Sequence, residues 1–254
     1  MRIIGGFIVM LALSGYFIAY AQDDEPQVAY AYVTYFICDP ATEARADEII
    51  KRNYAPHYNA AVEHGEIAQW SWLAHYVGGE WRRALVLTAL NMDDLLDASG
   101  ALGEIIEEAT PEAGRVFTEV CSQHVDYIWQ ASAGLDGTEI GAERGEVGFS
   151  MYLQCDMGRE EEADRLVRDE LAEVYDAAVQ NGSLASWTWL QHYVGGPHRR
   201  LLAMTGPDHK SVMRARGEII SALQDRKYKR FVDELNEICP AHEDYMWDIQ
   251  VETP

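Results

Sequence analysis

Runs of apolar residues along the chain change their spacing several times, and each change predicts a new element. Residues 30–38 are rich in β-branched and aromatic side chains, which is typical of a strand. Residues 42–64 are expected to be helical, because apolar positions recur near helical spacing in the matching segment 160–181. Gly65 and Gly182 follow these two segments and are expected to end the helices.

The residues that follow predict a hairpin, a broken helix and a last strand. Gly78-Gly79 is the hairpin turn, and Thr110-Pro111 breaks the next helix, because Thr can cap one helix and Pro can begin another. The long strand is predicted at 66–77 and its return strand at 81–89. The helix is predicted at 92–122 and the short last strand at 124–130. The order is therefore β-α-β-β-α-β, the ferredoxin-like motif.

The chain contains this unit twice. Residues 58–83 read YNAAVEHGEIAQWSWLAHYVGGEWRR and residues 175–200 read YDAAVQNGSLASWTWLQHYVGGPHRR, so that 16 of 26 positions are identical. The two copies are expected at 22–130 and 146–254. Residues 131–145 hold four glycines and little apolar periodicity, and they predict a glycine-rich linker.

The N-terminus has the pattern of a secretory signal peptide over residues 1–21. Arg2 precedes an uncharged apolar run, and Ala19-Tyr20-Ala21 matches the small-x-small cleavage site. We therefore expect cleavage after Ala21, a periplasmic or extracellular protein, and no membrane association after cleavage. The alternative is an uncleaved membrane anchor, because the run approaches the ~20 residues that span a bilayer.

The composition is that of a folded and acidic protein. Apolar residues make up 48% and charged residues 24% of the chain, and 20 basic against 42 acidic residues give a net charge of −22. This balance argues against nucleic acid as a partner, because phosphate binding needs clustered Lys and Arg. It argues equally against an anionic membrane surface.

The duplicated βαββαβ unit, with a long second strand ending in Trp-x-Trp-x-x-His-Tyr-x-Gly-Gly, resembles the dimeric α+β barrel superfamily. That group includes antibiotic-biosynthesis-monooxygenase-like, EthD-like, stress-responsive barrel and NIPSNAP-like domains. The resemblance implies an α+β fold in which two ferredoxin-like repeats form an intramolecular pseudo-dimeric barrel with helices outside. We expect a monomer or a weak homo-oligomer.

The topology implied by the resemblance brings the four cysteines together in pairs. In such a sheet the first strand ends at the edge where the second helix ends, so Cys38–Cys121 and Cys155–Cys239 are the natural disulfides. Export favours disulfides over the alternative of four buried thiols.

Aromatic residues with polar tips are the main candidates for a site. Alternation along the first strand places Tyr35 inside the barrel, with Tyr152 as its partner in the second copy. We expect a cavity lined by Tyr35, Trp72 and His75, or by Tyr152, Trp189 and His192. The alternative is that these aromatic residues only pack the two sheets together.

Histidines and arginines near the hairpins could carry chemistry. His75 and His192 are candidate general bases or acids, because the reference pKa of His, ~6.5, is near neutral; they could equally bond a carbonyl or face solvent. Arg82 and Arg199 are candidates to bind the carboxylate group of a ligand; the alternative is that they pair with neighbouring acidic side chains. His57 replaces an apolar residue of the second copy, so we expect it to be partly buried and count it as a candidate ligand contact.

Two function classes follow from these features. The first is an exported protein that binds a small apolar or aromatic molecule, or a cofactor-independent enzyme of oxygenase or isomerase type, which is the chemistry the resemblance implies. The alternative is a non-catalytic extracytoplasmic interaction or structural module. The sequence has no HExxH or Cys-x-x-Cys motif, so we predict no metal site and no cofactor, with haem left open by family analogy.

Overall fold

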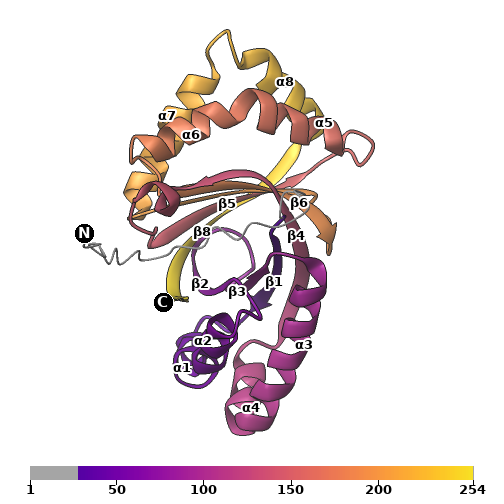
Figure 1. The fold of residues 1–254 in the computed structure, drawn as a ribbon, viewed down its shortest axis with the longest axis vertical. Coiled ribbons are helices and arrows are strands. Elements are labelled where there is room, and N and C mark those ends of the chain that lie inside the picture. The colour runs from indigo at the N-terminus through magenta and orange to yellow at the C-terminus, as the bar shows by residue number, and fades with distance from the viewer. Residues whose placement is uncertain (1–27, 254) are drawn as a thin grey trace, which may run out of the picture.

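Eight strands form one closed barrel that lies between two layers of helices (Figure 1). The computed structural model describes residues 28–253, so the predicted signal peptide lies outside the described residues. Helices α1 to α4 cover one side of the barrel and α5 to α8 cover the other. The predicted pseudo-dimeric α+β barrel is therefore confirmed.

The first copy contributes four strands, whose bounds are β1 (Tyr30–Ile37), β2 (Gln69–Val77), β3 (Arg83–Ala89) and β4 (Gln123–Asp136). Its helices are α1 (Ala44–Ile49), the π-helical turn η1 (Ile50–Tyr54), α2 (Ala55–Glu63), α3 (Met92–Ala109) and α4 (Pro111–Val120). The first three of these follow one another without a break and correspond to the single helix predicted at 42–64.

The second copy repeats the order with β5 (Val147–Gln154), β6 (Ser186–Val194), β7 (Arg200–Gly206) and β8 (Ala241–Glu252). Its helices are α5 (Glu160–Arg165), the π-helical turn η3 (Leu166–Leu171), α6 (Ala172–Gln180), α7 (His209–Leu223) and α8 (Lys229–Ile238). The 3₁₀ turn η2 (Gly137–Ile140) lies between the copies. Because the π-helical turn occurs in both copies and only the first has Pro56, the proline is not its cause.

The last strand of each copy closes the barrel by pairing with the other copy. The strand order is β1-β3-β2-β8-β5-β7-β6-β4, so the copies meet where β2 pairs with β8 and where β4 pairs with β6. In β4, Ala131 pairs with Leu190 and Asp136 pairs with Ser186. The last strand is therefore longer than the predicted 124–130 and takes in residues 131–136 of the segment expected to be a linker.

The paired glycines of each hairpin are required by a tyrosine from the other copy. A Cβ atom added to Gly78, which has φ +148°, would lie 2.5 Å from Cδ1 of Tyr245. Gly195 has φ +140°, and its Cβ would lie 2.5 Å from Cδ1 of Tyr127. Both positions therefore exclude any side chain, by space and by backbone conformation.

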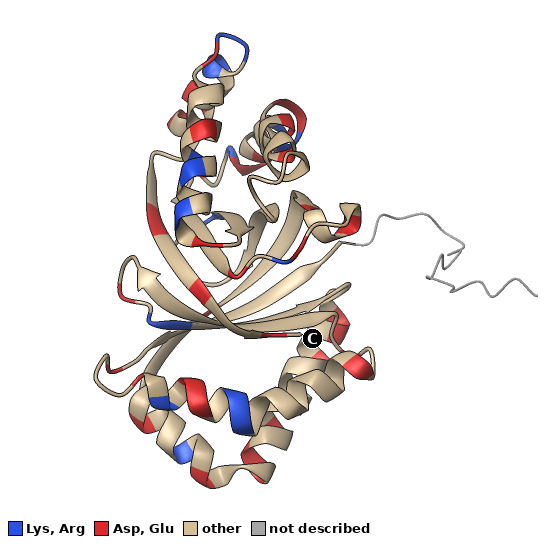
Figure 2. Cartoon of the chain, turned by 90° about the vertical axis from the view of Figure 1, so that its left-hand side faces the viewer, with Lys and Arg blue, Asp and Glu red and all other residues tan. Residues whose placement is uncertain are grey.

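Acidic residues are spread over both helical layers, whereas most strand positions carry no charge (Figure 2). This distribution matches the role of a solvated shell that keeps the protein soluble. Among residues 28–253, no helix is both long enough and apolar enough to cross a membrane.

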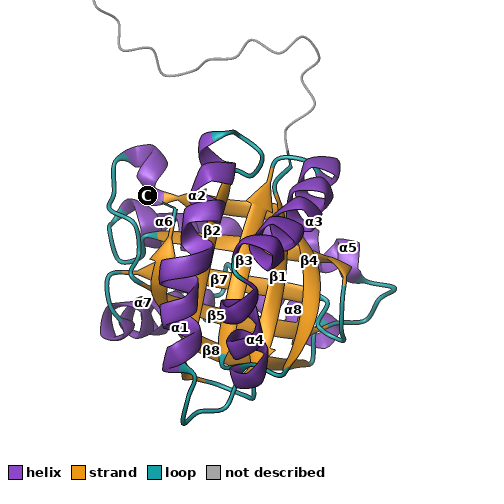
Figure 3. Ribbon diagram, turned by 90° about the horizontal axis from the view of Figure 1, so that it is seen from below, coloured by secondary structure: helices purple, strands orange, loops and turns teal. Residues whose placement is uncertain are grey.

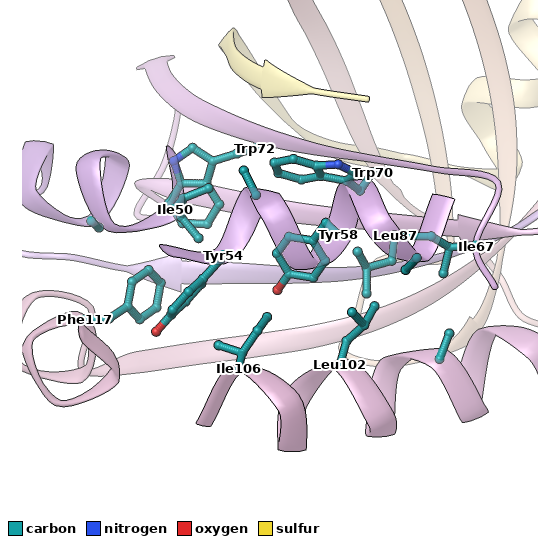
Figure 4. Packing of buried hydrophobic residues seen from close by; sticks show 14 of the residues in the cluster. Ile50, Tyr54, Tyr58, Ile67, Trp70, Trp72, Leu87, Leu102, Ile106 and Phe117 are labelled. Carbon is teal, nitrogen blue, oxygen red and sulfur yellow. The ribbon is translucent and has the colours of Figure 1, made fainter. Parts of the chain in front are cut away.

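The helices of the first copy lie across the outer face of the sheet (Figure 3). Between them and the strands is a core in which Trp70 and Trp72 meet Ile50, Tyr58 and other helix residues (Figure 4). The second copy has an equivalent core around Trp187 and Trp189. A third cluster of buried residues fills part of the barrel interior.

A buried arginine joins each helical layer to the sheet. Arg83 donates from Nε and Nη2 to both carboxylate oxygens of Asp47, at 2.6 and 2.7 Å, and Trp72 Nε1 donates to the same carboxylate at 2.8 Å. Arg200, Asp164 and Trp189 repeat the arrangement with the same donors and acceptor. The carboxylate therefore accepts the hydrogen bonds of the arginine and of the indole, both of which are shielded from water.

Each copy is also closed by a disulfide. Cys38, directly after β1, is bonded to Cys121 at the end of α4, and Cys155 is bonded to Cys239 in the second copy. No described cysteine is free. The predicted pairing is confirmed.

The first prediction concerns the disulfides. Cys38→Ser/Cys121→Ser is expected to lower the free energy of unfolding by roughly 4–5 kcal/mol, because the bridge closes a loop of 83 residues in the unfolded chain. Urea unfolding measures this, with the exposed neighbour Ser122→Ala as the control. Unfolding at the wild-type urea concentration by the double variant would contradict the prediction.

The second prediction concerns the buried arginine. Arg83→Met leaves the Asp47 carboxylate, only 13% exposed, without its cation, and should destabilise the fold by about 3–5 kcal/mol in urea unfolding. Arg52→Met breaks an ion pair whose partners are 78% and 56% exposed, and it should cost less than about 1 kcal/mol. Equal costs for the two variants would show that Arg83 has no special role.

Candidate functional site

A cavity of about 520 Å³ lies inside the barrel and opens at the end where β1 begins. Its volume falls within the roughly 300–1,000 Å³ typical of small-molecule sites. Apolar side chains from both copies form most of its wall: Ala31, Val33, Leu73, Val86, Leu190 and Leu201. They face inward because alternate residues of each strand point to the barrel interior.

Two tyrosines and two tryptophans form the inner end of the cavity. Tyr35 on β1 and Tyr152 on β5 occupy equivalent positions, with ring centroids 5.5 Å apart. Trp129 on β4 and Trp247 on β8 lie beside them, and their Nε1 atoms are buried without a hydrogen-bond partner among the described residues. An indole N–H can only donate, so this end of the cavity is rich in hydrogen-bond donors.

Both tyrosines stay neutral. Burial raises the pKa of Tyr35 well above its usual value, the nearby Tyr152 raises it further, and the Trp129 indole offsets part of the rise. Burial also raises the pKa of Tyr152, which the adjacent Tyr35, Ser150 and Trp247 partly oppose. Each phenol therefore keeps its proton near neutral pH and can donate it in a hydrogen bond.

The other end of the barrel is closed by aromatic rings. Trp81 stacks between Tyr35 and Tyr245, at centroid distances of 4.2 and 5.0 Å. His198 takes the equivalent place in the second copy, 5.6 Å from the ring of Tyr152. These rings are buried and separate the cavity from solvent at the hairpins.

The mouth of the cavity is polar. Arg144 Nη1 donates to the carbonyl oxygen of Thr253 at 2.5 Å and lies 3.9 Å from a carboxylate oxygen of Glu252. Burial raises the pKa of Glu252, Arg144 opposes this rise, and Asp136 adds to it. The charged groups among the lining residues are thus confined to the entrance.

The expected cavity residues are only partly where the sequence suggested. Tyr35 and Tyr152 line the cavity. Trp72 and Trp189 do not; they point away from the barrel into the cores beneath the helices, as Figure 4 shows for Trp72. There their indoles donate to the carboxylates of Asp47, which is part-buried, and of Asp164, which is buried.

The histidine and arginine candidates bond to each other. Arg82 Nη1 donates to Nδ1 of His75 at 2.7 Å, and Arg199 Nη1 donates to Nδ1 of His192 at 2.8 Å. Because arginine can only donate, each Nδ1 accepts and the ring proton lies on Nε2, which is buried without a described partner. Neither histidine is among the residues that line the cavity.

The remaining bonds of these arginines go to acids at the start of the first helix in each copy. Arg82 is bidentate to Glu43, and Arg199 binds both carboxylate oxygens of Glu160. Burial lowers the pKa of His75, and the adjacent Arg82 lowers it further, so its ring is neutral. The alternative of an internal ion pair therefore describes both arginines, whose Nε, Nη1 and Nη2 atoms each have a partner in the same copy.

The last candidate, His57, lies on α2 and is half-buried, as expected. It is not among the residues that line the cavity. Sequence reasoning did not select Trp129, Trp247 or Ser150 for the site. The signal that would have selected them is strand alternation, since Trp129 shares a face with Tyr127 and Ser150 shares one with Tyr152.

The lining of the cavity does not fit haem. Iron in haem takes an axial ligand such as His, Cys thiolate, Met or Tyr, and the described lining offers no imidazole or thiolate. Its two tyrosines, Tyr35 and Tyr152, are phenols whose pKa burial raises, which disfavours the phenolate that would bind iron. Met204 is among the lining residues but packs into the helix-facing core of the second copy. Within residues 28–253, no group of three or more His, Cys, Asp or Glu could hold a metal ion.

Comparison with known proteins finds similarity in fold alone. No protein-family model matches the sequence, and no curated protein matches it. A monooxygenase-like protein from Fusobacterium nucleatum has a TM-score of 0.59 at 8% identity, covering 90% of this chain and 95% of that chain. One from Lactobacillus acidophilus has 0.58 at 6%, covering 89% and 96%.

An anthrone oxidase-like protein is similar to the same extent. It has a TM-score of 0.57 at 11% identity, and the match covers 90% of this chain and 93% of that chain. Identities this low establish the arrangement of the elements and nothing about the reaction. Together with the barrel closure and the order of the strands, they show that this chain has the dimeric α+β barrel fold, with one polypeptide supplying both halves.

Proposed function

We propose that this protein binds a small, apolar, ring-shaped molecule inside its barrel. The observation that carries the proposal is the cavity of about 520 Å³, which is open at one end and walled by aliphatic and aromatic side chains. Apolar surface of a ligand that enters such a cavity leaves water, at about 25 cal/mol for each Å². The named neighbours, two monooxygenase-like proteins and an anthrone oxidase-like protein, are compatible with small-molecule use of the same fold.

The geometry supports binding more directly than catalysis. Proton abstraction needs a base within hydrogen-bond reach of the reacting atom. The acids that line the cavity, Asp136 and Glu252, are at its mouth, and both tyrosines at the inner end are neutral phenols. The oxygenase or isomerase chemistry implied by the resemblance therefore has no assigned residues here.

The alternative of a purely structural module predicts a barrel filled by its own side chains. The hairpin end agrees with this, because Trp81, Tyr127, Tyr245 and His198 pack it closed. The open end does not agree, because the space inside its aliphatic wall is not filled by side chains. We therefore favour ligand binding over a structural module.

We also propose that the protein is exported and acts as a monomer. Export is supported by the two disulfides, which persist in oxidising compartments, and by the signal-peptide pattern of residues 1–21. A monomer is supported by the closed barrel, in which every strand of residues 28–253 has a neighbour on both sides and offers no free edge to a second copy.

The third prediction tests the cavity with tetralin, a bicyclic hydrocarbon without polar atoms. The wild-type protein should bind it in isothermal titration. Ala203→Phe places a ring into the cavity wall and should weaken binding by at least about tenfold, because the ring takes the space of the ligand. Ala222→Phe, at an exposed position of α7, is the control and should bind as the wild type does.

Circular dichroism in the near ultraviolet shows whether both variants keep the native packing. If a folded Ala203→Phe protein bound tetralin as tightly as Ala222→Phe, the ligand would lie elsewhere and the cavity proposal would be wrong. Absence of tetralin binding by the wild type, together with failure of anthrone to bind, would also reject it.

The fourth prediction tests export. When the full chain is produced with a secretion pathway, the mature protein should begin at Gln22 and carry no free thiols. Intact-mass measurement with and without reduction checks both points. A full-length chain retained in the membrane would instead indicate the anchor.

A further inference from the structure

The polarity of the cavity wall changes with depth. In each copy the paired strands β2–β3 and β6–β7 turn every second side chain to the interior, so their register divides this part of the wall into levels. At the level nearest the hairpins, Leu73 pairs with Ala84 and Leu190 pairs with Leu201. This inner level is therefore apolar in both copies.

The next level toward the mouth is half polar. Ser71 pairs with Val86 on the first copy, and Thr188 pairs with Ala203 on the second. β2 and β6 are four places apart in the closed order of eight strands, so they lie on opposite sides of the barrel. The two hydroxyls therefore belong to facing walls.

The level nearest the mouth is polar at all four positions. Gln69 pairs with Thr88, and Ser186 pairs with Thr205. Together with the two hydroxyls of the level before, these residues form a polar belt in the cavity lining: Gln69, Ser71, Thr88, Ser186, Thr188 and Thr205. Both copies contribute equally to the belt, and none of its side chains carries a charge.

The belt is open to a ligand. Gln69 is exposed and its other members are part-exposed. Thr88 Oγ1 donates to the carbonyl oxygen of Gln69 at 3.3 Å, and the hydroxyls of Ser186 and Thr205 bond to each other at 2.6 Å. Ser71 and Thr188 have no such bond to a described residue, so their hydroxyls are the ones left for a ligand.

The polar atoms at the inner end are less accessible. Tyr35 and Tyr152 are 2% exposed, and Trp129 and Trp247 are 0% exposed. The inner level of the wall includes Leu73 and Leu190, which are part-exposed. A ligand that fills this end therefore meets mainly aliphatic surface.

The charges of the lining do not favour a charged ligand. Asp136, Arg144 and Glu252 are at the mouth, where Arg144 bonds to the carbonyl oxygen of Thr253. A charged group held at the belt would lie among neutral side chains and lose hydration without gaining a counter-charge. An uncharged oxygen loses less, and it can bond to a hydroxyl.

We propose that the ligand is an uncharged amphiphile, whose apolar ring body lies at the inner end and whose oxygen-bearing head is bound at the polar belt by Ser71 and Thr188. This deepens the proposed function and rests on it. A hydroxyl both donates and accepts, so the head can be an alcohol, an ether or a ketone. The residues that select the head come from equivalent positions of the two copies.

The fifth prediction compares 2-tetralol with tetralin, which has the same two rings and no oxygen. Thr188→Val removes the hydroxyl and keeps the shape, so it should weaken binding of 2-tetralol roughly threefold to tenfold and that of tetralin less than about twofold. Ser71→Ala should act in the same way. Thr118→Val, on the exposed side of α4, is the matched control and should change neither affinity. Isothermal titration of the purified mature protein gives the dissociation constants.

Two charged analogues test the requirement for an uncharged head. 2-Aminotetralin is a cation near neutral pH and tetralin-2-carboxylate is an anion, and both keep the two rings. Each should bind at least about tenfold more weakly than 2-tetralol, because its charge is not compensated at the belt. Binding of either analogue as tightly as 2-tetralol would overturn the uncharged head.

Nuclear Overhauser contacts show the orientation of bound 2-tetralol. The proton on its hydroxyl-bearing carbon should contact the methyl groups of Thr188 and Thr205. The protons of its aromatic ring should contact the methyl groups of Leu73 and Leu190. The reverse pattern would overturn the proposed orientation.

The remaining outcomes are distinct. A purely structural role for Thr188 would weaken the binding of tetralin and 2-tetralol alike in Thr188→Val. That result, or an unchanged affinity for 2-tetralol in both Thr188→Val and Ser71→Ala, would overturn recognition at the belt and leave cavity binding intact, because tetralin still binds the wild type. Failure of the wild type to bind any of the four compounds would overturn the proposed function and this inference together.

Discussion

The pairing of each last strand with the opposite copy is the constraint on which the rest of the structure depends. Each copy forms a four-stranded sheet of its own, and because β4 also pairs with β6 and β8 with β2, the two sheets close into one barrel. The same strands carry Tyr127 and Tyr245, which occupy the space above the hairpin glycines, and Trp129 and Trp247, which reach the cavity. Closure of the barrel, the form of the hairpins and the inner end of the cavity are therefore set by one pair of strands.

The sequence predicted those features that each copy carries within itself. Element order, the duplicated unit and the pairing of Cys38 with Cys121 all follow from contacts inside one copy, and the structure confirms them. The last strand was predicted too short because its continuation, from Ala131, pairs with the other copy. Residues rich in glycine and poor in apolar periodicity resemble a linker when the partner strand is unknown.

Alternation along a strand sorts residues into two faces but does not say which face is inside. Trp72 and Trp189 were expected in the cavity because indoles suit ring-shaped ligands, but they belong to the outer face, where the carboxylates of Asp47 and Asp164 accept hydrogen bonds from their indole N–H groups. A buried carboxylate shared by an indole and an arginine leaves no short-range pattern in the sequence. His75 was likewise expected in the cavity, but its side chain bonds to Arg82, which lies across the hairpin immediately before β3.

Fusion of the two copies into one chain is what permits an asymmetric cavity. In a barrel made from two identical subunits, any substitution in the wall occurs twice, so polar groups or free volume cannot gather on one side. Here Val33 corresponds to Ser150 and Trp81 to His198, and a symmetric dimer could not contain such differences between its halves. Substitutions that keep the cores beneath the helices unchanged can thus alter one half of the wall at a time.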